Sequence, residues 1–413
     1  MYILDELNRW LQSAMDPEIA FQLRLLVNEG SDSDLDDAFF QELEFGTAGL
    51  RGIIGAGTNR MNIYTVGKAT QGLADYLNAH YDEPSVAIAR DSRNKGELFM
   101  QRAASVLAAN GIRVHIFQRV EPTPALSFSV RDLGCSAGIN VTASHNPAEY
   151  NGYKVYGEDG CQITSEAASE ISRAVAKVDC FNDVLATPFE EAVEYGMVQW
   201  IEEDTLDRFI DAVYKASAEY PGIEAEPLKL VYTPLNGTGL ECVERILNKV
   251  GITDITVVKE QAEPDGNFPT CPKPNPEIRE ALELGIETCE QVHPDLLLAT
   301  DPDADRVGVA CKCGSDYVLL TGNEMGILLL DYIARTRTAL GTMPEKPLAV
   351  STIVSTSMID PIAAEYGVEL KRTLTGFKWI GSIITDLEKD KEEDRFIFGF
   401  EESYGYLAGP HVR

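Results

Sequence analysis

Two short motifs in this sequence carry residues that could transfer a phosphoryl group. The first, Val141-Thr-Ala-Ser-His-Asn-Pro147, places Ser144 among small and polar residues. The second, Asp301-Pro-Asp-Ala-Asp305, holds three carboxylates at alternate positions. A serine can carry a phosphate, and clustered carboxylates can hold a hard divalent cation. We interpret the pair as two halves of a phosphoryl-transfer site for phosphorylated sugars.

The carboxylate motif has alternative interpretations. Apolar runs at 294–299 and 307–310 predict strands, so the motif occupies the turn between them. An EF-hand begins with the same spacing but needs Gly at its sixth position and Glu at its twelfth, where this chain has Arg306 and Lys312. A solvated acidic turn without a metal is the other alternative. Three oxygen donors that leave room for a phosphate ligand favour Mg²⁺.

Basic groups accompany the serine motif. The run 150–156 predicts a strand that places Lys154 just beyond the serine loop. The segment 45–52 is a glycine-rich loop that ends near Arg51 and could approach an anion closely. An ordinary glycine turn has the same composition, so the phosphate interpretation of this loop depends on the neighbouring motifs.

Two loops later in the chain suit sugar recognition. Thr375-Gly-Phe-Lys378 offers a hydroxyl, a flexible backbone and an ammonium group. Glu401-Glu-Ser403 follows an apolar run that begins at Phe396 and offers acceptors for sugar hydroxyls. No spacing rule assigns either role from the residues alone.

The elements that must position these residues alternate between strands and helices. Residues 1–44 predict amphipathic helices, and 201–220 predicts a helical connection. The β-α-β pattern implies parallel or mixed sheets flanked by helices. We expect three units, at 1–205 with the helical extension, 206–316 and 317–413. The clearest predicted strands and helices are 85–89, 96–110, 114–117, 228–232, 240–250, 325–333, 346–353 and 358–366.

Composition excludes several classes of partner. The 413 residues include 35 basic and 66 acidic side chains, for a net charge of −31. Nucleic acids and anionic membranes require a basic footprint, so neither is expected as a partner. Eight scattered cysteines indicate reduced thiols. No signal peptide or membrane span is evident, and we expect a cytoplasmic protein.

Taken together, the motifs resemble those of the α-D-phosphohexomutase superfamily, which includes phosphoglucomutases and phosphomannomutases. The resemblance covers the chain from Phe45 onward, and the Ser-His-Asn-Pro and triple-aspartate motifs are its most specific parts. The strings 45–52, 150–156 and Pro264-Asp-Gly-Asn-Phe-Pro269 are most similar to the phosphoglucomutase-2/phosphopentomutase branch.

The resemblance implies a fold and a set of site residues. The fold is α/β, with consecutive α/β/α three-layer domains and mixed sheets around a central active-site cleft. Ser144 would carry the phosphate and, with the three aspartates, bind Mg²⁺. The implied catalytic residues are Ser144, Lys154, Arg51 and His145; the implied metal ligands are Ser144, Asp301, Asp303 and Asp305; the implied substrate-binding residues are Thr375, Gly376, Lys378, Glu401, Ser403 and Arg306.

The resemblance also implies a reaction. Glucose 1-phosphate and glucose 6-phosphate would interconvert through the phosphoserine and a bisphosphate, with glucose 1,6-bisphosphate as activator. A phosphopentomutase, a phosphomannomutase, a phosphosugar-binding fragment without activity and a metal-dependent phosphatase are the alternatives. Partners would be small phosphorylated sugars, and the chain a monomer or homodimer. The family's fourth domain has a Ser-Gly-Thr phosphate loop that nothing here matches, so we expect that domain to be absent and the third to be incomplete.

Overall fold

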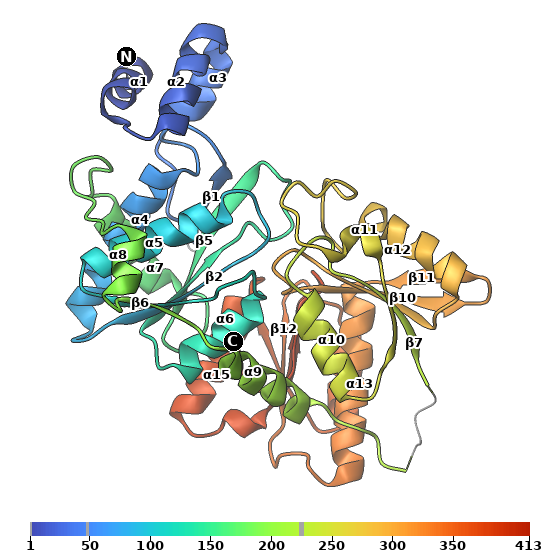
Figure 1. Cartoon of the computed structure of the whole chain (residues 1–413). Helices are drawn as coiled ribbons and strands as arrows, with labels where there is room; N and C mark the ends of the chain where they lie inside the picture. Colours follow the sequence, from blue (N-terminus) through green and yellow to red (C-terminus); the bar gives the residue numbers. More distant parts are fainter. Residues whose placement is uncertain (1, 47–48, 223–226) are drawn as a thin grey trace.

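Three α/β units follow one another along the chain, with a group of helices at the N-terminus (Figure 1). The structure is a computed structural model that describes residues 2–46, 49–222 and 227–413. Each unit is built on a mixed sheet. The expected class, consecutive α/β units with mixed sheets, is confirmed.

The N-terminal helices form a small layer that contacts the first unit. They are α1 (Tyr2–Ser13), α2 (Pro17–Glu29) and α3 (Asp32–Phe39). Side chains of Asp16 and Ser31 cap α2 and α3 by accepting backbone N–H bonds. Trp10, 1% exposed, meets the rings of Phe39 and Phe181 edge-on. Aromatic packing therefore attaches this layer to the loop after helix α7 (Ser165–Val175) of the first unit.

The first unit contains a six-stranded sheet in the order β1-β5-β4-β2-β3-β6. Neighbours from β4 to β6 are parallel, whereas β5 is antiparallel to both β4 and β1. Its elements are β1 (Gly49–Ile53), α4 (Ile63–His80), β2 (Ser85–Arg90), α5 (Gly96–Ala109), β3 (Arg113–Ile116), α6 (Thr123–Asp132), β4 (Ala137–Val141), β5 (Tyr150–Gly157), α7 (Ser165–Val175), α8 (Phe189–Glu194) and β6 (Val198–Trp200).

One expectation for this unit needs correction. We placed Arg51 in a glycine-rich loop, but it lies within β1, where it pairs with Gly152 of β5. Gly49 makes this possible because its φ of 108° and its closeness to the carbonyl of Tyr153 exclude a larger residue. Thr47 and Ala48 of the same motif lie outside the described residues.

The second unit follows helix α9 (Glu203–Ala216) and contains a five-stranded sheet in the order β11-β10-β9-β7-β8. Strands β9 and β10 are antiparallel neighbours, so the carboxylate motif occupies the turn between them, as predicted. Strand β11 crosses the expected boundary at 316/317 and extends this sheet to Leu320. The elements are β7 (Lys229–Thr233), α10 (Leu240–Lys249), β8 (Asp254–Val257), α11 (Lys259–Ala262), α12 (Arg279–Val292), β9 (Leu296–Thr300), β10 (Val307–Cys313) and β11 (Asp316–Leu320).

The third unit has a four-stranded sheet in the order β13-β12-β14-β15. Its long first helix begins with a capping box between Thr321 and Glu324 and ends at Gly341 in the left-handed conformation, so it is longer than the expected 325–333. The elements are α13 (Gly322–Leu340), β12 (Leu348–Thr352), α14 (Ile359–Glu365), β13 (Glu369–Thr373), α15 (Phe377–Lys389), β14 (Phe396–Phe400) and β15 (Tyr406–Leu407).

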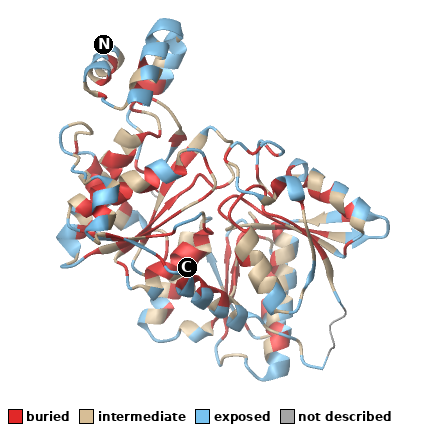
Figure 2. Ribbon diagram, viewed as in Figure 1, coloured by how far each residue is buried: buried red, intermediate tan, exposed pale blue. Residues whose placement is uncertain are grey.

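Buried residues show how the units are joined (Figure 2). One hydrophobic cluster combines Leu126 and Val130 of α6, Phe209 of α9, and Ile380 and Ile384 of α15. The first and third units therefore share a core. The second unit has its own cluster within its sheet and α12, and Cys242 and Ile246 of its helix α10 also pack against the shared core.

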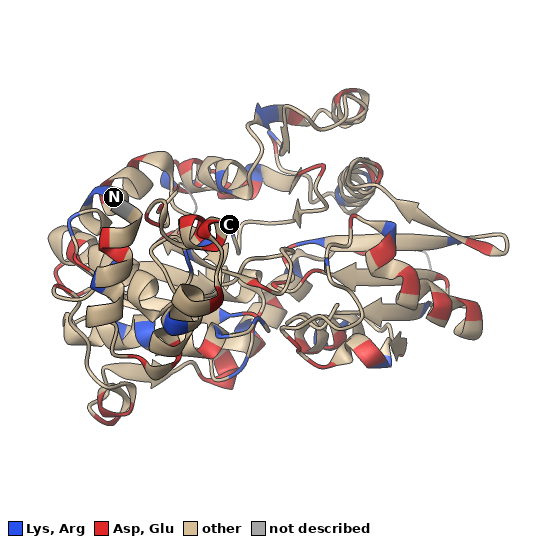
Figure 3. Cartoon of the chain, turned by 90° about the horizontal axis from the view of Figure 1, so that it is seen from above, with Lys and Arg blue, Asp and Glu red and all other residues tan. Residues whose placement is uncertain are grey.

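The polar surface matches the acidic composition, with Asp and Glu positions distributed along helices of all three units (Figure 3). Among the described residues, no helix combines the length and apolar content needed to cross a membrane. All eight cysteines are described, and each has a free thiol.

Candidate active site

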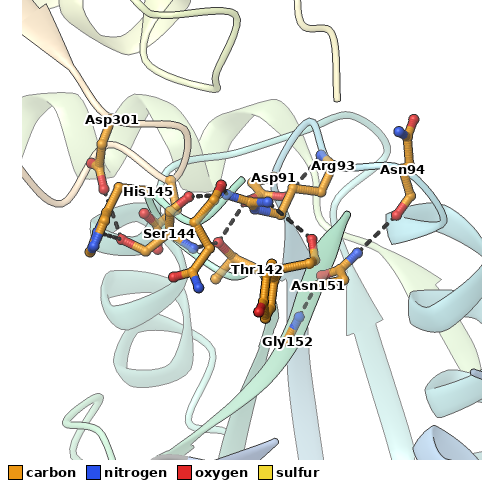
Figure 4. Close-up of polar contacts among 12 residues, drawn as sticks. Asp91, Arg93, Asn94, Thr142, Ser144, His145, Asn151, Gly152 and Asp301 are labelled. Carbon is orange, nitrogen blue, oxygen red and sulfur yellow. Dashed lines mark hydrogen bonds and ion pairs between the residues drawn. The ribbon is translucent and has the colours of Figure 1, made fainter. Parts of the chain in front are cut away.

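Ser144 lies in a tight turn between β4 and β5, with its backbone in the left-handed region at a φ of 51°. Its N–H donates to Thr142 Oγ1 at 2.8 Å, and the side chain of Thr142 in turn donates to Asp91 Oδ2 at 2.6 Å (Figure 4). A non-glycine residue adopts this conformation only where its surroundings hold it there. The turn is therefore preorganised around one serine.

The Ser144 hydroxyl reaches the second unit. Its Oγ donates to Asp301 Oδ2 at 2.8 Å and lies 3.3 Å from Nδ1 of His145. Ser144 is 3% exposed, and Asp301 is fully buried. Burial and the nearby charge of Arg306 lower the pKa of His145 to about 4, so its imidazole is neutral near pH 7. The two motifs, far apart in sequence, form one site.

Asp301, Asp303 and Asp305 converge at this point. Each offers a ligand atom within 4.8 Å of the others. The turn is closed by a bond from Ala304 N to Asp301 O at 2.9 Å, with Ala304 at a φ of 50°. Burial and the neighbouring carboxylates raise the pKa values of Asp301 and Asp305. Three carboxyl groups this close favour a cation that offsets their mutual repulsion.

Lys154 supplies part of that positive charge. Its Nζ donates to Asp303 Oδ2 at 2.7 Å and lies 3.6 Å from Asp305 Oδ2. Burial alone would lower the pKa of Lys154, but the two carboxylates raise it above its usual value. Burial conversely opposes ionisation of Asp303, while Lys154 and a 3.0 Å bond from Thr123 Oγ1 lower its pKa. Lys154 and Asp303 therefore stay ionised.

Among the described residues, the carboxylate cluster has a buried oxygen without a hydrogen-bond donor, and a divalent cation can bind it. Within the described chain, Asp303 Oδ1 is buried and has no hydrogen-bond partner. A buried carboxylate oxygen without a donor is costly, and a hard cation satisfies it. The donor set consists of oxygens, which suits Mg²⁺ better than a metal that prefers nitrogen or sulfur ligands. The three aspartates and Ser144 Oγ are the groups that would hold it.

The two predicted arginines come from different units, Arg51 from the first and Arg306 from the second. Arg51 on β1 is exposed and donates to Asn146 Oδ1 at 3.2 Å. Arg306 follows the carboxylate turn and forms an ion pair with Glu277. Burial would lower the pKa of Arg306, but Asp301, Asp305 and Glu277 raise it. Both are therefore cations beside the site.

A cavity of about 230 Å³ opens next to the carboxylate turn. Its wall combines Lys154, Asp305 and Arg306 with Lys378 of α15, so it joins all three units. Cationic groups from two sides give it the polarity that an anionic sugar phosphate requires.

The other expected sugar contacts form a separate group in the third unit. Gly376 N donates to Glu401 Oε1 at 2.5 Å, and Ser403 Oγ donates to Glu401 Oε2 at 3.3 Å. Burial raises the pKa of Glu401, whereas Thr375 is exposed. Of the residues described, these do not contribute to the cavity wall. Gly376, Glu401 and Ser403 therefore contact one another but do not line the cavity that contains Lys154.

Several residues of the site were not predicted. Asp91 and Arg93 follow β2, and Thr123 begins α6 after β3. Because β2, β3 and β4 are parallel neighbours, their carboxyl ends meet at one edge of the sheet, where Ser144 also lies. The predicted strands at 85–89 and 114–117 contained this signal, since both end next to polar residues.

Comparison with protein families gives three consecutive matches. Models of "Phosphoglucomutase/phosphomannomutase, alpha/beta/alpha" domains I, II and III match residues 42–180, 207–314 and 321–413. A phosphoglucomutase of Staphylococcus saprophyticus is 38% identical over 90% of this chain and 66% of its own length. One of Staphylococcus aureus is 35% identical over 98% of this chain and 70% of its own. The chain thus spans about two thirds of these relatives.

Solved structures agree on the fold. A putative phosphomannomutase from Thermus thermophilus has a TM-score of 0.71 at 24% identity, over 90% of this chain and 76% of that one. The open form of a Paramecium phosphoglucomutase, pp63/parafusin, has a TM-score of 0.67 at 17% identity, over 90% of this chain and 67% of its own. The arrangement of the three units is therefore shared with both proteins.

Proposed function

Because the chain belongs to the phosphoglucomutase/phosphomannomutase family, we propose that it interconverts glucose 1-phosphate and glucose 6-phosphate. A phosphate on Ser144 is the carrier, and a sugar bisphosphate is the intermediate. The observation that carries the proposal is the 2.8 Å contact between Ser144 Oγ and Asp301 within the three-aspartate cluster. It joins a nucleophile and a cation site from different units.

Ser144 Oγ is the atom that gives and receives the phosphoryl group. In one half-reaction the bond between phosphorus and Ser144 Oγ breaks as a sugar hydroxyl forms its own bond to phosphorus, and the proton that this hydroxyl loses is balanced by one gained at Ser144 Oγ. In the other, the second phosphate of the bisphosphate returns to Ser144 and releases the isomer. Glucose 1,6-bisphosphate can therefore load the serine before the first turnover, which accounts for a role as activator.

The groups around Ser144 accept or donate protons and stabilise charge during the transfer. Asp301 and the neutral His145 are the acceptors within reach of the Ser144 hydroxyl proton. Lys154, held protonated by Asp303, suits a proton donor or a stabilising cation rather than a base. A bound Mg²⁺ on the three aspartates supplies further neutralisation of charge on the transferring group.

Recognition of the sugar is assigned to the third unit together with Arg306 of the second. Lys378 and Arg306 in the cavity wall are cations suited to the phosphate that stays on the sugar. Glu401 and Ser403, with Thr375 and Gly376 of the facing loop, offer the acceptors and donors that sugar hydroxyls use. Arg51 stabilises the transferring phosphate from the side of Asn146.

The test is a peptide mass map after incubation with glucose 1,6-bisphosphate and Mg²⁺. We expect one phosphate on the peptide that contains Ser144, and none there in Ser144→Ala. The matched control is Ser169→Ala, an exposed serine on α7 that should leave the labelling unchanged. Asp303→Asn should lower the rate of labelling by about 10²–10³-fold. Labelling of folded Ser144→Ala at the same peptide would contradict the proposal.

A further inference from the structure

Arg93 lies outside the motifs that point to phosphoryl transfer, and its side chain binds the backbone of the turn that carries Ser144. Its side chain has no exposed surface. Nη2 donates to the carbonyls of Ser144, at 2.5 Å, and Asn146, while Nη1 donates to those of Pro147, at 2.8 Å, and Tyr150, at 3.0 Å. One guanidinium group therefore binds four backbone carbonyls of a single turn (Figure 4).

Asp91 orients this guanidinium group. Its Oδ2 lies 3.3 Å from Arg93 Nε, and its Oδ1 accepts from Arg93 N at 2.9 Å. Asp91 Oδ2 also accepts from Thr142, the residue that receives the N–H of Ser144. The backbone N–H and carbonyl of Ser144 are therefore both fixed by one buried network. This network accounts for the persistence of the left-handed backbone at the serine.

A loop of the second unit covers the same guanidinium group. The ring of Phe268 lies 5.1 Å from the Arg93 Cζ, and Phe268 is 1% exposed with a φ of 46°. Next to it, Asn267 Oδ1 accepts from Asn94 Nδ2 at 3.0 Å. A Cβ on Gly266 would lie 2.4 Å from Asn94 N, so the two loops are in direct contact. The unit that carries the three aspartates thus also touches Arg93.

We propose that Arg93 is a positioning residue for Ser144 and that Phe268 couples its position to the second unit. In this arrangement, packing of the second unit against the first positions the three aspartates of the cation site. The same contact orders the serine turn through Phe268 and Arg93. The kinetic part of this inference rests on the proposed mutase function, whereas the ordering of the turn does not depend on it.

The geometry requires arginine in particular. A planar guanidinium offers N–H donors in a fixed fork, and here Nη1 and Nη2 bind four carbonyls while Nε forms an ion pair with the Asp91 carboxylate. A lysine ammonium has three donors around one point and no flat face for the Phe268 ring. Arg93→Lys therefore keeps the charge but loses most of the carbonyl contacts.

The first experiment measures amide hydrogen exchange of the unphosphorylated full chain, followed by mass spectrometry. We expect exchange within residues 142–150 to speed up by at least about 10-fold in Arg93→Lys and by a smaller factor in Phe268→Leu. The matched control is Arg113→Lys, an arginine of the same sheet whose side chain is 56% exposed. Unchanged exchange in both variants would overturn the inference whether or not the chain is a mutase.

The second experiment separates positioning from general damage to the fold. In Arg93→Lys we expect kcat to fall by about 10²-fold with KM changed by less than about 3-fold. Added guanidinium ion should restore part of the kcat of Arg93→Ala and none of that of Asp303→Asn. A wild-type kcat in Arg93→Lys would overturn the inference, whereas a wild-type chain that does not label at Ser144 would overturn the proposed function instead.

The coupling is tested with the double variant Arg93→Lys/Phe268→Leu. If Phe268 acts through Arg93, the combined loss of kcat is smaller than the product of the two single losses. Losses that simply multiply would show that Phe268 acts independently and would overturn the coupling. Because Arg93→Lys keeps the charge and Phe268→Leu keeps an apolar side chain, this test remains available even if Arg93→Ala does not fold.

Discussion

The first unit meets the third unit and the second unit through surfaces of different polarity. Toward the third unit, α6 and α15 share a hydrophobic cluster that includes Leu126, Val130, Ile380 and Ile384. Toward the second unit, α9 and α10 face each other with ion pairs, among them Arg245 with Glu203 at 2.8 Å. The first contact is a core, whereas the second combines exposed ion pairs with the packing of Cys242 and Ile246 of α10 against that core.

This difference indicates which contacts between units are insensitive to salt and which are weakened by it. Burial of apolar surface makes the first and third units one body. Exposed ion pairs contribute little and are screened by salt, so they hold the second unit weakly. The second unit also meets the first at the site itself, through buried contacts of Asp301, Asp303 and the Phe268 loop.

The largest effect is expected in the shared core. Ile384→Ala should lower the free energy of unfolding by about 2–5 kcal/mol because it leaves a cavity at a fully buried position. Tryptophan fluorescence measures the unfolding of the first and third units, because Trp200 lies in β6 of the first and Trp379 in α15 of the third. Separate transitions for the first and third units in the wild-type chain would break the comparison.

Next in size is the effect of Mg²⁺ on the contact with the second unit. At a free concentration of 100 times its Kd, the ion should raise the free energy of unfolding by about 2.7 kcal/mol. Calorimetry with and without a chelator measures the shift. Asp303→Asn is the control and should lose most of it, and a shift that survives in this variant would place the ion elsewhere.

A smaller effect concerns Glu121, buried where the first and second units meet. Burial raises its pKa to about 7, although Arg119 opposes this. The folded state therefore binds the proton more tightly, and the associated stability is present below about pH 4.5 and lost as pH rises through 7. Glu121→Gln mimics the protonated form, so it should exceed the wild-type chain in stability at pH 8 by about 1–2 kcal/mol.

Thermal unfolding at pH 5 and pH 8 measures this difference, which should nearly vanish at pH 5. Glu203→Gln is a matched control, because Glu203 faces the same ion pairs but its side chain is 57% exposed. A stability gain of equal size at both pH values would show that Glu121 does not act through its proton.

The smallest effect is expected for the ion pairs between α9 and α10. Arg245→Gln removes contacts to Glu203 and Asp207 that are largely open to solvent. We expect a loss of about 0.5 kcal/mol in low salt and almost none in about 0.5 M NaCl. Chemical denaturation at the two salt concentrations measures it. A loss of more than about 2 kcal/mol in the free energy of unfolding would show that these ion pairs contribute as much as the hydrophobic core.

The sequence was most informative where function is local. Ser144 and the three aspartates lie in short motifs whose spacing alone suggests their chemistry, and the structure joins them. Strands and helices with clear patterns, such as β2 and α10, lie where they were predicted. The network around Arg93 was not predictable, because its importance comes from carbonyls more than 50 positions away.

Two differences in the fold have identifiable causes. Strand β11 was missed although Gly314, at a φ of 65°, lies in a short turn between two apolar runs, a pattern that indicates a hairpin. Arg51 was assigned to a loop because glycines surround it, yet pairing with β5 makes the segment a strand. In both cases contact with a neighbouring strand outweighed local composition.

The burial of Ser144 also determines how this serine can acquire a phosphate in a cell. With 3% of its surface exposed and its backbone fixed on both sides, the turn cannot extend into the cleft of another protein. A protein kinase needs such an extended segment, so we expect kinases to leave Ser144 untouched. Under the proposed function, the charge state of this serine would then follow the supply of small sugar bisphosphates, independently of kinase signalling.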